Sequence, residues 1–235
     1  MEENNNPKIG LRDGIPICLG YFSVSFAFGI FATGEGLSVL ESVMISLFNL
    51  TSAGQLAGVP IIAHGGGFFE LALTQLIINL RYALMSVSLS QKLGKSVRLR
   101  DRFWIAFGNT DEVFAVASGQ HGSVGRRYMG ALIITPIIGW TSGTLCGAVA
   151  GNILPSVVVS ALGIAIYAMF IAVVIPKACI DRKVALCARL SVGLSCLFYF
   201  LPYLKSIPSG FVIIICAVAA SAVFALLMPV DEEDA

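Results

Sequence analysis

FFELALTQLIINLRYALMSVSLS, residues 68–90, is the stretch that decides the fold. A bilayer core about 30 Å thick is crossed by a helix of roughly 20 apolar residues, and this run has that length. Only Glu70 and Arg81 are charged within it, and the basic loop KLGKSVRLRDR, residues 92–102, follows directly. Basic loops flank transmembrane helices on the cytoplasmic side, so we predict a span that ends at the cytoplasmic surface.

The rest of the chain continues this pattern of long apolar runs. Of its 235 residues, 57% are hydrophobic and 12% are charged, whereas soluble globular domains carry about 25% charged residues. We therefore expect an all-α, polytopic integral membrane protein, with residues 1–235 forming one membrane domain in the lipid bilayer. The net charge of +1 gives no sign of nucleic-acid binding. Five further runs have the length of a full span: 15–33, 129–151, 156–175, 184–204 and 209–228.

Two more apolar segments are interrupted by polar residues. Residues 42–62 contain NLTSAGQ, and residues 103–120 contain GNTDE. If both segments crossed the membrane fully, Arg126 and Arg127 would lie on the opposite side from the basic loop at 92–102. Cytoplasmic loops are enriched in Lys and Arg, which makes that topology unfavourable.

Re-entry of both interrupted segments places nearly all basic residues on one side. Of the fifteen Lys and Arg residues, all are then cytoplasmic except Arg81, which is inside the membrane, and Lys205, which is outside the cell. This count predicts about six full spans and two interrupted, re-entrant helical elements, with both termini in the cytoplasm. The N-terminal segment 1–14 and the acidic C-terminal tail 229–235 are then cytoplasmic.

In this topology the first hairpin enters from outside and the second from the cytoplasm, so their polar tips meet near the middle of the membrane. Non-helical backbone at that depth is tolerated only where it is buried in protein or lines a watery cavity. Transporters commonly place their substrates at such broken helices. We therefore expect the functional site at the two tips.

A series of glycines predicts where two helices pack closely. Small residues at a spacing of four let helix backbones approach each other, so we interpret this series as a packing ridge. Ser25, Gly29 and Thr33 form a similar, weaker stripe. The glycines of the main series are Gly139, Gly143, Gly147 and Gly151.

Arg81 lies near the centre of its span, where an arginine costs about 2.5–3.5 kcal/mol on insertion scales. Such a residue usually faces the protein interior and has a partner. One interpretation is a structural ion pair between two helices, and the other is a bidentate clamp on a substrate carboxylate. Asn79 lies two residues earlier, off the face of the helix that carries Arg81.

Asp111 and Glu112 are the only adjacent acids inside an apolar segment. They stand where a short helix begins, a position that favours acidic side chains. A carboxylate at membrane depth can also exchange a proton or hold an ammonium group, and either acid is a natural partner for Arg81. In the first hairpin, Gln55 either hydrogen-bonds a substrate or satisfies exposed backbone groups.

No motif of a metal centre, a cofactor site or a hydrolase is present in the sequence. The six cysteines are scattered through apolar stretches without a CxxC pair, and HExxH and GxSxG are absent. Gly94-Lys95-Ser96 resembles the end of a phosphate-binding loop, but Leu89 stands where the first glycine is required. We therefore expect no cofactor, no metal and no enzymatic activity.

Five stretches, in order, resemble the AzlC-type proteins, the large subunits of bacterial branched-chain amino-acid exporters. The resemblance covers about residues 10–228, with Tyr82 where many members carry histidine and Ala165 where many carry an acid. The matching stretches are GIPICLGYFSVSFAFGIFATGEGLS (14–38), TSAGQLAGV (51–59), INLRYALMSVSLS (78–90), NTDEVFAV (109–116) and YAMFIAVVIP (167–176).

The resemblance implies a permease of the bacterial plasma membrane that exports branched-chain amino acids with an AzlD-type small membrane subunit. It places five residues among the family's characteristic positions, and we predict that they bind substrate: Gln55, Asn79, Arg81, Asp111 and Glu112. Asp111 and Glu112 are also predicted to couple export to proton movement. Two alternatives from other classes remain: a membrane-embedded enzyme that uses the two acids on a lipid-linked substrate, and a passive channel.

Overall fold

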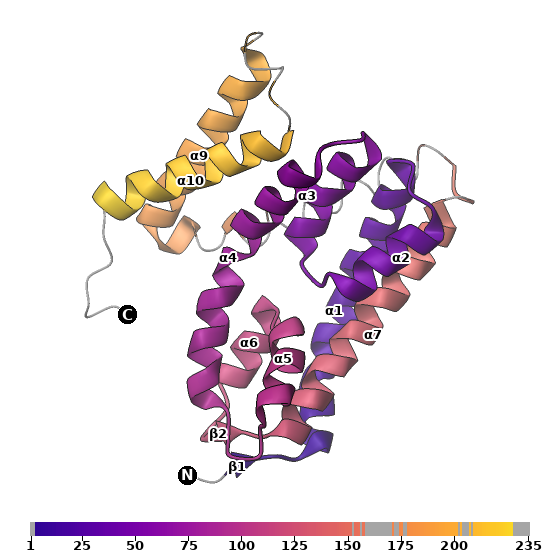
Figure 1. Cartoon of the computed structure of the whole chain (residues 1–235), viewed down its shortest axis with the longest axis vertical. Coiled ribbons are helices and arrows are strands. Elements are labelled where there is room, and N and C mark those ends of the chain that lie inside the picture. Colours follow the sequence, from indigo (N-terminus) through magenta and orange to yellow (C-terminus); the bar gives the residue numbers. More distant parts are fainter. Residues whose placement is uncertain are drawn as a thin grey trace.

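The protein consists almost entirely of helices, as the computed structural model shows for residues 3–151, 153–155, 157, 171, 174–175, 178–201, 203, 207 and 209–227 (Figure 1). Within these residues, four helices are long and apolar enough to cross a membrane, in agreement with four of the six predicted spans. A fifth apolar helix, α10 (Ser209–Leu227), matches the run at 209–228. The span predicted at 156–175 lies almost wholly outside the described residues. The four long helices are α1 (Pro7–Gly34), α4 (Phe68–Lys92), α7 (Arg126–Gly151) and α9 (Arg182–Phe200).

Each interrupted segment folds as two short helices that are joined at its polar residues. The helices contain 8 to 12 residues, so at 1.5 Å per residue each reaches about halfway through a bilayer core. Thr51 and Thr110 are the N-caps of the returning helices. The first pair is α2 (Val39–Phe48) and α3 (Ser52–Ala63), and the second is α5 (Leu99–Phe107) and α6 (Asp111–Ser118).

Both hairpins return to the end from which they start. Strand β1 (Glu3–Asn4) pairs in parallel with β2 (Ser123–Val124), and Leu93 forms a bridge to Val124. The segment that contains α5 and α6 therefore begins and ends beside the N-terminus. At the opposite end, Nε2 of His64 lies 4.0 Å from Oε2 of Glu35, which closes the segment that contains α2 and α3. Both interrupted segments are therefore helical hairpins, as the prediction of re-entry requires, and their depth in the membrane remains a prediction.

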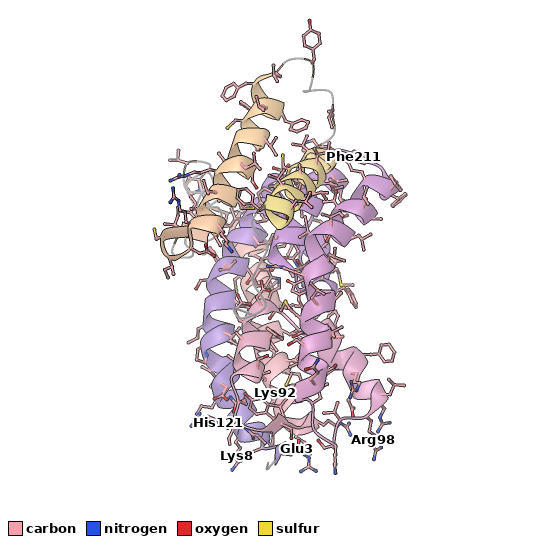
Figure 2. All side chains as sticks on the ribbon, turned by 90° about the vertical axis from the view of Figure 1, so that its left-hand side faces the viewer. Glu3, Lys8, Lys92, Arg98, His121 and Phe211 are labelled. Carbon is pink, nitrogen blue, oxygen red and sulfur yellow. The ribbon has the colours of Figure 1, made fainter. Side chains whose placement is uncertain are left out.

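Basic residues gather at the N-terminal end of the molecule. Figure 2 shows Lys8, Lys92 and Arg98 at this end, together with Glu3, and Phe211 far from them. Lysine and arginine side chains that gather on one side of a membrane protein are typical of its cytoplasmic surface. The cytoplasmic location of this end remains a prediction.

The two hairpins belong to two units with the same order of elements and opposite directions. A long helix and a pair of half-helices make up the first unit (α1, α2, α3) and again the second (α4, α5, α6). Phe48 and Phe107 are the last residues of α2 and α5, and in each unit a threonine N-cap follows three residues later. Oppositely directed repeats are typical of secondary transporters. This arrangement was not recognised in the sequence, where the shared pattern is only F-x-x-T.

The close contact of α1 with α7 forms the main packing interface of the described residues. The two helices run in the same direction, and each step of four residues along α7 matches a step of four along α1. A Cβ atom added to the glycines of α7 would fall on backbone carbonyl groups of α1: Gly139 on Cys18, Gly143 on Phe22 and Gly147 on Phe26. The predicted glycine ridge is therefore confirmed.

The weaker stripe on α1 faces the same interface. A Cβ atom on Gly29 would collide with the carbonyl oxygen of Thr144, and the Ser25 side chain lies against Gly143. The hydroxyl of Thr33 donates within its own helix, to the carbonyl oxygens of Gly29 (3.1 Å) and Ile30 (3.1 Å). Close backbone approach therefore holds α1 and α7 as one rigid support beside the hairpin tips.

We predict that Gly147→Ala destabilises the protein by about 1–3 kcal/mol, because the added methyl group overpacks the interface. Gly130→Ala in the same helix is the matched control, since nothing lies within 4 Å of its added Cβ atom. Thermal unfolding of the purified variants in detergent measures the difference. Equal midpoints for the two variants would contradict the close approach of α1 and α7.

Cysteine labelling tests the re-entry of α5 and α6. In a background without the native cysteines, Lys95→Cys and Ser123→Cys should react with an impermeant maleimide from the same side, the cytoplasm. Gly66→Cys, at the other end of α4, should react only from outside. A full crossing by 99–118 would instead place Lys95 and Ser123 on opposite sides.

Candidate functional site

Two adjoining cavities lie where the hairpin tips meet. The larger has a volume of about 410 Å³ and extends to α1 and α7, and the smaller has about 180 Å³ and lies beside α4. Leu50, Tyr82 and Thr110 line both cavities, so these residues form the boundary between them. The volume of the larger cavity is within the range of small-molecule sites, about 300–1,000 Å³.

The helix ends at the tips are divided between the two cavities. Ser52, Asp111 and Glu112 line the larger cavity, and they are the first residues of α3 and α6. The smaller cavity is lined by the last residues of α2 and α5, including Phe48 and Phe107. Helix N-termini carry partial positive charge and C-termini partial negative charge. The first residues of α3 and α6 therefore lie on the larger cavity, and the last residues of α2 and α5 lie on the smaller one. The N-caps Thr51 and Thr110 also line the smaller cavity.

Arg81 forms an ion pair with the first residue of α6. Its Nη1 atom lies 2.7 Å from Oδ2 of Asp111, and both side chains are about half exposed. The Cζ atom of the Arg81 guanidinium lies over the Tyr82 ring, 5.0 Å from the ring centroid. The Tyr82 hydroxyl accepts a hydrogen bond from Nη2 of Arg81 at 3.3 Å. The expected carboxylate partner of Arg81 is thus Asp111. Among the described residues that line either cavity, Asp111 is present and Arg81 is not.

Glu112 is bound from the opposite wall of the larger cavity. The Tyr21 hydroxyl donates a hydrogen bond to Oε2 of Glu112, and the Tyr21 ring packs edge-on against Trp140 at 5.2 Å between centroids. Tyr21 and Trp140, from α1 and α7, were missed in the sequence. A usable signal was the Tyr21 hydroxyl within an apolar span, because a buried hydroxyl of this kind requires a hydrogen-bond partner.

Gln55 lies away from both cavities at the tips. It is 1% exposed, and its Nε2 donates to the carbonyl oxygens of Ile45 (3.3 Å) and Asn49 at the end of α2. The Asn49 carbonyl is one that the end of a helix leaves unpaired, and the Ile45 carbonyl also accepts from the N–H of Asn49. Gln55 of α3 therefore hydrogen-bonds to the backbone of α2. This matches the second of its two interpretations, in which it satisfies backbone groups instead of binding substrate.

Asn79 lines the smaller cavity, and its Nδ2 donates to Oε1 of Gln75 at 3.2 Å. Of the five predicted substrate-binding residues, the tips thus bring together Arg81, Asp111 and Glu112, with Asn79 beside them. Their contact with substrate remains a prediction.

The comparisons with known proteins agree with this architecture. Residues 16–154, which contain both hairpins, match the AzlC protein family. The chain is 33% identical over 185 residues to the inner membrane protein YgaZ of Escherichia coli K12, covering 76% of this chain and 75% of YgaZ. An uncharacterized membrane protein of Archaeoglobus fulgidus is 32% identical over 170 residues, or 72% and 74% of the two chains. No solved structure matches significantly. The chain belongs to the AzlC family and is a membrane transporter.

Proposed function

We propose that the protein exports branched-chain amino acids across the bacterial plasma membrane by secondary active transport, together with a small AzlD-type membrane subunit. The observation that carries the proposal is the larger cavity at the meeting point of two oppositely directed hairpins. It combines two carboxylates with the positive ends of two helices. This combination suits a zwitterion, which brings one charge of each sign.

The two charged groups of an amino acid have separate partners in this cavity. The substrate carboxylate accepts hydrogen bonds from free N–H groups at the start of α3, where Ser52 lines the wall. The substrate ammonium donates to Asp111 or Glu112 at the start of α6. The apolar side chain then lies against Ile17 and Val24 of α1.

The ion pair of Arg81 with Asp111 supplies a switch for access. When the substrate ammonium takes Asp111, Arg81 loses its carboxylate partner and is free to bind the substrate carboxylate or to move with α4. Each hairpin reaches the cavity from a different end, so movement of one unit against the other opens the site to one side at a time. Protonation of Asp111 or Glu112 in one of these states couples export to proton movement.

We predict that radiolabelled leucine leaves preloaded cells only when this chain and the small subunit are both present, because the resemblance implies a two-component exporter. Efflux should saturate with internal leucine, and unlabelled leucine outside should drive counterflow. Saturation and counterflow separate a carrier from a passive channel. Leucine efflux that rises linearly with internal concentration, or chemical alteration of the leucine, would contradict the proposal.

Neutral substitutions of the two acids test their separate roles. Asp111→Asn and Glu112→Gln should each lower the leucine efflux rate at least about tenfold, the loss expected for one charge-assisted contact. Glu35→Gln, outside the tips, is the matched control and should leave efflux unchanged. Membrane abundance of each variant is measured in parallel. Normal efflux by both tip variants from pH 6 to 8 would remove the acids from the mechanism.

A further inference from the structure

The smaller cavity has walls rich in oxygen but without a formal charge. Among the described residues that line it, none is acidic or basic, and five carry an amide or hydroxyl group in addition to Tyr82: Asn49, Thr51, Asn79, Asn109 and Thr110. The substrate proposed above occupies the larger cavity and leaves this one unused. Its volume of about 180 Å³ lies below the range of about 300–1,000 Å³ that is typical of small-molecule sites.

A relay of amide groups sets the orientation of Asn79. The carbonyl oxygen of Gly54 can only accept, so Gln75 must direct its Nε2 toward it, at 2.7 Å. Oε1 of Gln75 then accepts from Nδ2 of Asn79 at 3.2 Å. Asn79 is thereby left with its Oδ1 atom as a buried acceptor, for which the described residues supply no donor. The backbone of α3 thus determines that Asn79 offers an oxygen.

Asn109 and Thr110 add two more buried oxygens from the second hairpin. Asn109 is 3% exposed and Thr110 6%, and Nδ2 of Asn109 donates to the Ser86 hydroxyl at 3.2 Å. No hydrogen-bond donor within the described part of the chain reaches Oδ1 of Asn109. The Thr110 hydroxyl lies beside the Tyr21 hydroxyl, and the lone pairs of its oxygen stay available. A buried acceptor without a partner costs about 1–3 kcal/mol, so the two amide oxygens at one cavity indicate a missing donor or cation.

The electrostatics of the cavity select the sign of the ligand. The C-terminal ends of α2 and α5 line it, and such ends favour cations. The N-caps Thr51 and Thr110 also line it, but through side chains whose hydroxyl oxygens can accept. Divalent cations usually require carboxylate ligands, which this cavity lacks. In transporters, the C-terminal ends of broken helices and unwound carbonyl groups hold monovalent ions.

We propose that the smaller cavity binds a small monovalent cation through the neutral oxygens of Asn79, Asn109 and Thr110. The cation is Na⁺ or a primary ammonium group, which share this chemistry. Because Leu50, Tyr82 and Thr110 also line the larger cavity, the bound cation holds the two hairpin tips together and shapes the substrate site.

The test measures thermal unfolding of the purified full-length protein in detergent, without any amino acid. NaCl, methylammonium chloride and choline chloride are compared at equal ionic strength. We expect NaCl to raise the midpoint saturably relative to choline, by roughly 5 °C at a concentration 100 times Kd. A rise with methylammonium alone would assign the cavity to an ammonium group instead of a metal ion.

Two variants link the effect to the cavity. Asn79→Leu and Asn109→Ala, which each remove one oxygen, should weaken the apparent cation affinity at least about tenfold. Gln120→Leu removes an amide at the N-terminal end of the molecule, far from the cavity. This variant should bind the cation with the same apparent affinity as the unchanged protein. The inference is overturned if neither salt differs from choline, or if the shift persists in both variants. Because no amino acid is present, such a failure would leave the export proposal standing.

Discussion

Two breaks in the helical backbone, at residues 49–51 and 108–110, impose the constraint on which the rest of the structure depends. Each break leaves N–H and C=O groups without helical partners at the depth of a bilayer core, where no lipid atom can hydrogen-bond to them. Threonine N-caps begin the returning helices, and Gln55 satisfies carbonyl groups at the end of α2. Residues of both breaks line the two cavities. The same unpaired groups that make the breaks costly thus make them suitable for binding charged ligands.

The opposite directions of the two units determine how these groups are distributed. Because α2–α3 and α5–α6 approach from different ends, their tips meet, and the N-terminal ends of α3 and α6 lie on the larger cavity. The C-terminal ends of α2 and α5 lie on the smaller one, beside the N-caps Thr51 and Thr110. One tip therefore cannot move without changing the walls of both cavities. The closely packed pair of α1 and α7 forms the opposite wall of the larger cavity, through Tyr21 and Trp140.

Much of this architecture was predictable from the sequence because it follows from hydropathy and charge. Helix length in a bilayer identified the spans, and the distribution of basic residues distinguished re-entry from full crossing at 42–62 and 103–120. The glycine series identified the packing face of α7 because only small residues permit such close contact, but it did not identify α1 as the partner. These features follow from short-range patterns of apolar, basic and small residues and from the thickness of the bilayer.

The details of the site depend on contacts between distant segments, and the sequence alone could not supply them. The pairing of Tyr21 with Glu112 joins α1 to α6, and no local pattern links these residues. Gln55 could serve substrate or backbone until the end of α2 was placed beside it. The direction of the Asn79 amide follows from Gly54, in another helix, through Gln75. The repeated F-x-x-T at the tips is too short to be recognised without the fold.

The meeting of the two hairpin tips is the central claim, and cross-linking of cysteine pairs tests it most directly. Leu50 and Ala106 line one cavity from different hairpins, so Leu50→Cys with Ala106→Cys should be joined by a bifunctional maleimide with a short spacer of about 8 Å. The control pair Gly66→Cys with Lys95→Cys, at opposite ends of α4, should not be joined. Cross-linking of the tip pair alone is the result we predict. Failure of the tip pair, with both cysteines shown to be reactive, would contradict the account.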